Sequence, residues 1–292
     1  PLVMGSRATF GLGQFGGNAT GTLRAGHVLR LARRNQANVL PAIEPAELTR
    51  EWSVGVLYGP HGAPDFFLEE DIETLFSTPY EVHFNSARTG VRLIGPAPKW
   101  ARTDGGEAGL HPSNLHDNAY AIGAIDFTGD MPIILGPDGP SLGGFVCPAV
   151  IARDEQWKMG QFKPGDKIRF HAVARATDPL AGPTVKRISE AAGSAVIGAT
   201  EADGVPVVYR RQGDDNLLVE YGPMQLDIGI RMRVHLLMHA VKAARLQGLI
   251  DLTPGIRSLQ VHYQPETLTL QALLDIVAGE WDAVCAARDL KV

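Results

Sequence analysis

Cysteine is scarce in this sequence, and its scarcity excludes several classes of protein. The 292 residues contain two cysteines, Cys147 and Cys285, which lie far apart and outside any metal-binding spacing. Neither a disulfide framework nor a zinc site follows from such a pair. We therefore expect no bound metal and a reducing location, the cytoplasm.

Long hydrophobic runs are also missing, and neither sign of charge dominates. No apolar stretch approaches the roughly 20 residues that span a bilayer, and no leader is evident. The chain begins at Pro1, which suggests a processed chain or a fragment. The formal net charge is −5, without a basic stripe for nucleic acid or an anionic membrane. We expect small molecules or other proteins as partners, and neither nucleic acid nor membrane.

Familiar catalytic motifs are absent as well. Ser141, in "GPDGPSLGGF", lacks the Gly-x-Ser-x-Gly spacing of a nucleophile, and Cys147 lies in an apolar run typical of a buried strand. The glycine-rich "FGLGQFGG" and "GPDGPSLGG" lack both the Walker lysine and the Rossmann order of elements. His111 and His116 are five residues apart, and Pro112 between them excludes the helical histidine pair of a zinc site.

Glycine and proline, by contrast, are abundant, with 33 and 20 residues. In residues 1–173 they separate short apolar runs such as "SVGVLYG", "VRLIG" and "MPIILG", a spacing typical of a mostly β domain. Two helices are expected in this domain. One covers "FFLEEDIETLFS", with Asp65 as its cap, and the other covers "DEQWKMGQF", near Asp154.

The rest of the chain has a different rhythm. Residues 174–205 are rich in Ala, Gly and small polar residues, and we expect them to form a linker. Residues 206–292 predict a small ββαββα domain, with helices from about Gln225 to Leu246 and from about Glu266 to Ala287. The fold class is therefore α+β, a mostly β domain followed by a small α/β domain.

One irregular stretch, "EAGLHPSNLHDNAYAIG", concentrates hydrogen-bonding side chains between glycines. Asn114 and Asn118 each offer a carbonyl acceptor and an amide donor, and His111 and His116 donate or accept. Such a mixture suits an amide substrate. The alternative is that these side chains cap turns in a glycine-rich loop.

Two arginines, Arg88 and Arg92, lie four residues apart in "NSARTGVRLIGP". If the segment is extended, they share one face and form a clamp for a carboxylate. Surface salt bridges are the alternative.

A longer stretch carries a family resemblance. Residues 91–166, from "VRLIGPAPKW" to "QFKPGD", closely resemble the carboxyltransferase region of biotin-dependent urea carboxylase, the half of urea amidolyase that makes allophanate. Residues 1–173 look like an N-terminally incomplete allophanate hydrolase subunit 2 domain, and residues 206–292 like the N-terminal α/β part of subunit 1. The resemblance implies a cyclophilin-like β barrel and an active site where the two domains meet.

The same resemblance implies a reaction. A carboxyl group would pass from carboxybiotin to urea, giving allophanate, in urea degradation. Carboxybiotin would arrive on a separate carrier domain, charged by a biotin carboxylase domain that uses ATP and Mg. The sequence contains neither of these domains, and neither a "Met-Lys-Met" biotinylation motif nor an amidase Ser-Ser-Lys signature.

Within this picture we predict roles from side-chain chemistry. The catalytic group contacts the urea NH and carbonyl groups or supports proton transfer, and consists of His116, Asp117, Asn118, His111 and Asp138. The substrate group, in which an arginine holds the carboxylate of carboxybiotin, consists of Asn114, Tyr120, Arg88 and Arg92. The cofactor group, whose glycine NH groups face the biotin ureido oxygen, consists of Ser141, Gly143 and Gly144.

Two alternatives to urea carboxylation stay open. One is a carboxylase for another small amide, guanidine or 5-oxoproline, and the number of carboxylates in the pocket distinguishes cationic guanidine from neutral urea. The other is a Kip-type regulator that binds a kinase. A flat apolar patch favours the regulator, whereas a pocket with convergent polar groups favours the enzyme.

Overall fold

The computed structural model describes residues 2–3, 5–10, 13–17, 23–29, 46–107, 109–173, 186–187, 194–202 and 204–286. The chain divides into two compact units, Pro1–Glu47 and Leu48–Val292. In the first unit, strands β1 (Thr9–Phe10) and β2 (Phe15–Gly16) form an antiparallel pair. The second unit contains a barrel and a larger sheet, and the candidate sites lie there.

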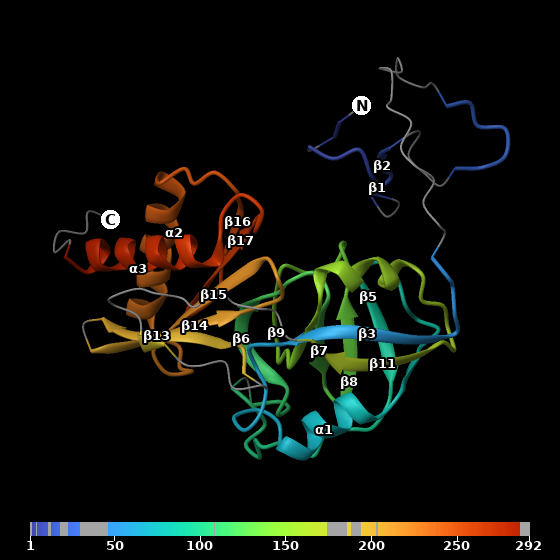
Figure 1. Ribbon diagram of the computed structural model, residues 1–292, viewed down its shortest axis with the longest axis horizontal. Coiled ribbons are helices and arrows are strands. Elements are labelled where there is room, and N and C mark those ends of the chain that lie inside the picture. The colour runs from blue at the N-terminus through green and yellow to red at the C-terminus, as the bar shows by residue number, and fades with distance from the viewer. Residues whose placement is uncertain are drawn as a thin grey trace. The chain divides into compact units, whose positions relative to one another are not determined.

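The second unit begins with a closed barrel of seven strands (Figure 1). Strand β3 (Glu51–Tyr58) alternates at its start, with Trp52 and Val54 buried in the core and Ser53 exposed, as expected for a strand with one covered face. The prediction of a mostly β domain is thereby confirmed. The other barrel strands are β4 (Tyr80–Val82), β5 (Gly90–Ile94), β7 (Ala124–Thr128), β8 (Met131–Leu135), β10 (Ala149–Ile151) and β11 (Lys167–Ala172).

Two short helices accompany the barrel, and both differ from their predicted form. Helix α1 (Glu69–Ser77) begins too far along the chain for Asp65 to cap it. Asp71 does the capping instead, because its carboxylate accepts from the Leu68 backbone N–H at 3.0 Å. The second helix, η1 (Arg153–Gly160), is a 3-10 helix that contains Asp154.

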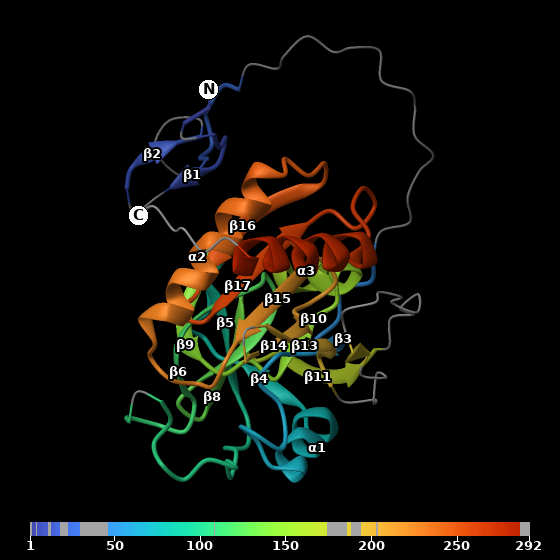
Figure 2. The ribbon, with the colours of Figure 1, turned by 90° about the vertical axis from the view of Figure 1, so that its left-hand side faces the viewer.

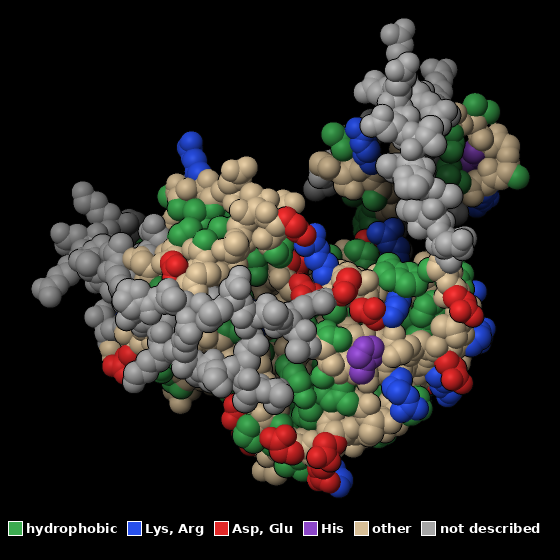
Figure 3. Space-filling model, viewed as in Figure 1, with side chains coloured by type: hydrophobic (Ala, Val, Ile, Leu, Met, Phe, Trp, Pro, Cys, Tyr) green, Lys and Arg blue, Asp and Glu red, His purple; other side chains and the backbone are tan. Residues whose placement is uncertain are grey.

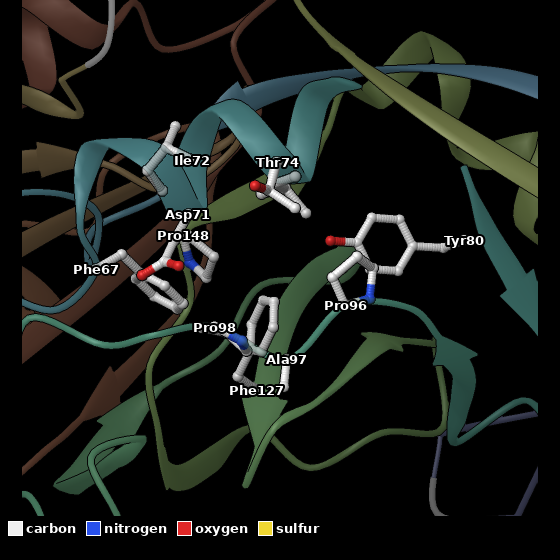
Figure 4. Close-up of a pocket in the computed structure, with 11 residues that line it drawn as sticks. Phe67, Asp71, Ile72, Thr74, Tyr80, Pro96, Ala97, Pro98, Phe127 and Pro148 are labelled. Atoms are coloured by element: carbon white, nitrogen blue, oxygen red, sulfur yellow. The ribbon is translucent and has the colours of Figure 1, made fainter. Parts of the chain in front are cut away.

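A narrow crevice lies beneath α1, and Figure 4 shows its lining of apolar rings and prolines. Its volume is about 10 Å³, which is room for a single water. The one carboxylate in it, Asp71, already accepts from the backbone N–H groups of Lys99 (2.9 Å) and Trp100 (3.2 Å). The crevice is therefore a packing defect of the core and not a candidate site.

The second sheet has six strands, and two helices cover one of its faces (Figure 2). The first helix buries residues at three- and four-residue steps, from Ile230 to Val241, against the sheet. No described helix is both long and apolar enough to cross a membrane. In spatial order the strands are β12 (Lys186–Arg187), β13 (Val196–Ala202), β14 (Val205–Arg211), β15 (Asn216–Tyr221), β17 (Ser258–Tyr263) and β16 (Leu249–Pro254), and the helices are α2 (Ile228–Ala243) and α3 (Leu270–Ala286).

Strand β13 lies inside the range 174–205 for which we predicted a linker, so the sheet takes up residues 196–202 of that range. The segment "VIGATEA" stands among many Ala, Gly and small polar residues, which hid it, but it pairs with β14, whose Val207 and Tyr209 are fully buried. Its own Ile197 is buried in the same core. Residues 174–185 and 188–193 of the predicted linker lie outside the described residues.

A two-stranded ribbon joins the two stretches that the sequence singled out. Strand β6 (Asn114–Ala119) comes from the polar stretch and pairs antiparallel with β9 (Leu142–Phe145), which comes from "GPDGPSLGGF". Asn118 stands opposite Gly143, and the register shifts between Asn114 and Asn118. On one side β6 contacts β16 and β17, and on the other β9 contacts β7 of the barrel. The ribbon therefore lies between the barrel and the second sheet.

The ribbon depends on a glycine. A Cβ atom at Gly143 would lie 2.4 Å from the ring of Tyr120, which is far inside van der Waals contact. We therefore expect Gly143→Ala to lower the free energy of unfolding by about 1–3 kcal/mol, because ring and strand must separate. Guanidinium chloride denaturation measures the change.

The matched control is Gly160→Ala, where a Cβ would meet open space. We expect that variant to stay within about 0.5 kcal/mol of the parent. Equal stability of both variants would show that Tyr120 does not depend on close packing against Gly143.

Candidate functional site

A small pocket opens between the barrel side and the second sheet, and we name it the interface pocket. Its volume is about 20 Å³, which is about twice the space of the crevice beneath α1. From the barrel side and β6 it is lined by His61, Glu107, Leu115, His116, Asp117 and Asn118, and from the second sheet by Glu220, Met224, Ile256, Arg257 and Ser258. The structure thus brings together three of the predicted catalytic residues, His116, Asp117 and Asn118.

Asn118 is fixed by polar contacts to both sides. Its Oδ1 accepts from the Ser258 hydroxyl at 3.1 Å, and its Nδ2 donates to the Ala119 carbonyl at 3.1 Å. The same carbonyl accepts from Nε2 of Gln212 at 2.7 Å, and Gln260 donates to Gln212 at 2.7 Å. These side chains are buried, so each lost partner would leave an unpaired polar group. The network holds Asn118 in one orientation at the pocket wall.

His61 is a neutral hydrogen-bond donor at this pocket. The Cys147 backbone N–H donates to its Nδ1 at 3.1 Å, so the proton of the neutral ring resides on Nε2. Burial lowers the pKa of His61 to about 3, because its effect and that of Arg210 and Arg257 outweigh the attraction of Glu220 for a protonated ring. Within the described chain no acceptor is recorded for Nε2, and the ring lines the pocket. The Nε2–H group is therefore free to donate to a ligand.

Glu220 carries a buried negative charge that two arginines neutralise. Its carboxylate accepts from Nε of Arg210 at 2.5 Å and from Nη2 of Arg257 at 2.7 Å. Burial alone would raise the pKa of Glu220, but attraction by Arg257 and Arg210 outweighs it, so the pKa lies below its ordinary value. Removing either arginine would leave an uncompensated charge in the interior.

Glu107 and its neighbours form the opposite wall. Its Oε2 accepts from the His116 backbone N–H at 2.9 Å, and its Oε1 lies 3.9 Å from Nη1 of Arg102. Glu107 Oε1 and Arg102 Nη1 are both buried, and neither makes a hydrogen bond in the described structure. Asp117 is exposed, and its carbonyl accepts from the Ile256 backbone N–H at 3.0 Å, which fastens β6 to the second sheet.

The charges around the interface pocket balance. Three carboxylates line it, and three guanidinium groups lie beside it or pair with those carboxylates, so the sum of −3 and +3 is zero. His61 adds no charge because its ring stays neutral. A neutral polar molecule is the ligand that such a site suits best. The six charged residues are Glu107, Asp117 and Glu220, with Arg102, Arg210 and Arg257.

A second, larger cavity of about 390 Å³ lies on the barrel side of the ribbon, and we name it the ribbon cavity. Of the predicted residues, it contains Arg92, Tyr120 and Gly143. The Tyr120 hydroxyl accepts from the Phe145 N–H at 2.7 Å and lies 3.3 Å from the Phe145 carbonyl. Burial raises the pKa of the Tyr120 hydroxyl, so this hydroxyl stays protonated and does not act as a base.

Arg88 and Arg92 do not form the predicted clamp. Strand β5 begins only at Gly90, so Arg88 stands in the turn that the Ala87–Gly90 bridge closes, and alternation along a strand does not apply to it. Its guanidinium pairs with Asp138 at 3.0 Å, with both side chains more than half exposed. This pair is the surface salt bridge that the sequence left as the alternative, and neither residue lines a pocket described above.

The remaining predicted residues have structural partners. His111 makes a hydrogen bond with the Ser113 hydroxyl at 3.0 Å, and its Nε2 lies 3.5 Å from Asp130, away from the interface pocket. Asn114 begins β6, and Ser141 is exposed beside the ribbon. At Gly144 a Cβ would lie 2.7 Å from the Leu115 carbonyl, so this glycine permits close pairing of the ribbon. The predicted contacts of the cofactor group remain predictions.

Among the polar residues of the interface pocket, Glu107 stands in the polar stretch but was given no role, and four were missed by sequence reasoning: His61, Glu220, Arg257 and Ser258. His61 lies in the turn "GPHG", and Arg257 with Ser258 follows the turn "TPGI", so a search of polar residues beside turns would have found three of them. Glu220 lies in a strand and carries no such signal. Residues from the two sides of the pocket, such as Asn118 and Glu220, are over 100 residues apart along the chain.

The described surface does not suggest a metal or a polyanion as ligand. Among the described residues, no group of three His, Cys, Asp or Glu side chains could hold a metal ion. On the face shown in Figure 3, Lys and Arg side chains alternate with Asp and Glu over the barrel. No field of one sign forms on that face.

Comparisons with known proteins show the family of the chain. Residues 1–172 match the family model described as carboxyltransferase domain, subdomain A and B, and residues 207–291 match the model for subdomain C and D. The chain is 43% identical to a urea amidolyase of Lachancea kluyveri and 41% identical to one of Saccharomyces cerevisiae, over 96% of this chain. These matches cover 17% of each relative, so the chain spans about a sixth of their length.

A solved structure extends this similarity to the fold. The urea carboxylase of Kluyveromyces lactis matches with a TM-score of 0.82 at 37% identity. The match covers 97% of this chain and 28% of that chain.

The neutral state of His61 leads to a pH-dependent stability. The unfolded chain binds a proton on this ring below about pH 6.5, whereas the folded chain does so only near pH 3. Stability contributed by the neutral ring is therefore lost as pH falls through this window. From pH 6.5 to 5.0 we expect a loss of roughly 1.5 kcal/mol from this group.

The comparison variant is His61→Gln, which cannot titrate but can accept from Cys147. Its free energy of unfolding should decline less than that of the parent between the two pH values, by this same amount. Parallel declines, measured by denaturant unfolding, would show that His61 is protonated in the folded chain.

Proposed function

Because the chain belongs to the carboxyltransferase domain family, we propose that it transfers the carboxyl group of carboxybiotin to urea, giving allophanate. The observation that supports urea is the interface pocket, which is small, charge-balanced and lined by fixed donors and acceptors. Since the chain spans 17% of its curated relatives, the biotin carboxylase and the carrier that bears biotin act as partner domains in this proposal.

Urea fits the pocket through complementary hydrogen bonds. The Nε2–H of His61 donates to the urea carbonyl, in the way that an oxyanion-hole donor does. The amide N–H groups of urea donate to Glu107 Oε1, which has no hydrogen bond in the described structure, and to Asp117. Asn118 orients the molecule, because its own amide is fixed by Ser258 and Ala119. A fixed site of this kind lowers the entropy cost of bringing urea to the carboxyl group.

The pocket is too small for the biotin ring, so only the carboxyl group of carboxybiotin would enter it. When bound, carboxybiotin would supply this carboxyl group and a basic ring nitrogen for the urea proton. Arg257 holds the carboxylate, since it lines the pocket whereas Arg88 and Arg92 do not. Its position next to Glu220 keeps the guanidinium in place, and the neutral His61 does not compete for the proton.

The alternatives receive less support. Guanidine is a cation and would favour an excess of carboxylates, whereas here three carboxylates face three guanidinium groups. 5-Oxoproline is a larger molecule than urea, and a pocket of about 20 Å³ leaves it less room. A Kip-type regulator would favour a flat apolar patch, but the polar groups of the pocket converge.

The test is carboxyl transfer by the chain when it is supplied with a carboxylated biotin carrier protein and urea. Allophanate, measured by mass spectrometry, should form at a rate that His61→Ala lowers about 100-fold or more, as loss of one fixed donor does elsewhere. Asn118→Ala should also lower the rate, because the side chain that orients urea is lost. His61→Gln should retain more activity than His61→Ala, because its amide can donate.

The matched control is Gln264→Ala, which removes an exposed amide outside both cavities. It should leave the rate unchanged. An Asn118→Ala variant as active as the parent, with its stability intact, would reject the assignment of urea to this pocket.

A further inference from the structure

One part of the interface pocket is formed by a connection and not by a strand. Residues 222–227 join β15 to α2, and we name them the Met224 segment. Met224 lines the pocket and is 38% exposed, so it stands where the pocket meets solvent. The residue that controls access from the sheet side is therefore on a loop.

The Met224 segment is fixed only at its two ends. At its start the Gly222 N–H donates to the Pro206 carbonyl at 2.8 Å. At its end the Asp227 carboxylate accepts from two N–H groups in the first turn of α2 and so caps that helix. In the described chain, the one hydrogen bond recorded for residues 223–226 stays within the segment. The middle of the segment can therefore shift while its ends stay in place.

A glycine directs the segment back to the pocket. The φ angle of Gly222 is 61°, in the left-handed region, and a Cβ there would lie 2.6 Å from Cδ1 of Ile230. Strand β15 therefore ends in a turn that requires glycine. As a result Glu220, before the turn, and Met224, after it, line the same pocket.

Neighbouring walls are held more firmly than Met224. Leu115 is 7% exposed and belongs to the barrel core. Asn118 and Ser258 are joined by a hydrogen bond of 3.1 Å, and two arginines hold the Glu220 carboxylate. A ligand that pressed on these walls would disturb core packing or break polar contacts.

The polarity of the pocket directs an alkyl substituent toward Met224. In the proposed complex the urea N–H groups donate to Glu107 and Asp117, which lie on the barrel side and β6. An alkyl group cannot donate to a carboxylate, so an N-alkyl urea keeps these hydrogen bonds only if its substituent points to the sheet side. The apolar side chains there are Met224 and Ile256, and Met224 is the more exposed of the two.

We propose that Met224 limits the substrate to unsubstituted urea, because its side chain occupies the space that an N-alkyl group would need. This inference rests on the proposed function and adds to it the residue that selects the substrate by size. In apolar pockets one methylene changes kcat/KM by about 10- to 200-fold, so a longer alkyl chain that collides with Met224 is rejected at least as strongly. An unbranched thioether suits this position because it adapts to the shape of a small ligand.

The experiment pairs a shortened side chain with a lengthened substrate. Met224→Ala removes Cγ, Sδ and Cε, and N-propylurea carries an alkyl chain with the same number of heavy atoms. The whole chain is supplied with a carboxylated biotin carrier protein, and carboxyl transfer to urea and to N-propylurea is measured separately by mass spectrometry. We expect the parent to prefer urea by about 100-fold or more in kcat/KM.

Met224→Ala should change this preference from both directions. The kcat/KM for N-propylurea should rise about tenfold or more, because the propyl group fills the space that the side chain has left. The kcat/KM for urea should fall, because urea is held less closely. Met224→Leu, with a side chain of similar volume, should keep the preference of the parent.

The matched control is Met232→Ala, which makes the same chemical change on α2. Met232 is 36% exposed and lines neither the interface pocket nor the ribbon cavity. Both kcat/KM values should equal those of the parent. A loss of preference as large as that of Met224→Ala would show that the selection does not arise in the pocket and would overturn the inference.

A binding measurement separates this inference from the proposed function. Isothermal titration calorimetry on the chain alone gives the affinities for urea and N-propylurea without carboxyl transfer. If Met224→Ala gains affinity for N-propylurea but the parent makes no allophanate, the proposed function is wrong and the size limit of the pocket stands. If the parent makes allophanate but Met224→Ala keeps its preference for urea, the inference is wrong and the proposed function stands. A parent that binds N-propylurea as tightly as urea, or binds neither, also contradicts the inference.

Discussion

The structure depends on where strand β6 is held. Its backbone pairs with β9, its Asp117 carbonyl accepts from Ile256 of the second sheet, and Asn118 accepts from Ser258. Without these contacts β6 would not be fastened to the second sheet, and the interface pocket would have only one wall. Because Gly143 permits the Tyr120 ring to lie against β9, the ribbon can be thin enough to have a cavity on its other side.

Burial gives three ionisable side chains of the second unit three different protonation states. His61 is desolvated and close to arginines, so its ring stays neutral. Glu220 is equally buried, but two guanidinium groups contact it directly and keep it charged. Asp126 has no direct cation, and its pKa therefore lies near neutrality. The nearest partner, and not the depth of burial, decides between a donor, a counterion and a titrating acid.

The sequence allowed the mostly β domain, the α/β unit and the polar stretch to be predicted, because periodicity and the spacing of glycines are local signals, whereas the barrel was implied by the family resemblance. The same signals failed where a strand or a pocket depends on residues far away in the chain. Residues 196–202 form a strand that pairs with β12 and β14, and the arginine pair was divided because β5 begins between Arg88 and Arg92. His61 and Arg257 reach one pocket from positions nearly 200 residues apart, which no local pattern records.

Asp126 shows a different limit of prediction from sequence, because the pattern around it was visible in the sequence but ambiguous. In "AIDF" the acid alternates with two apolar residues, which is typical of a strand with one solvated face. The ribbon covers that face, so the acid became buried, and only the pairing of β6 with β9 reveals this. The same pairing connects the two cavities, since Asn118 of one stands opposite Gly143 of the other. Substitutions in the ribbon would therefore disturb both sites, whereas Asp126 and Arg92 belong to barrel strands and can be changed without moving Asn118.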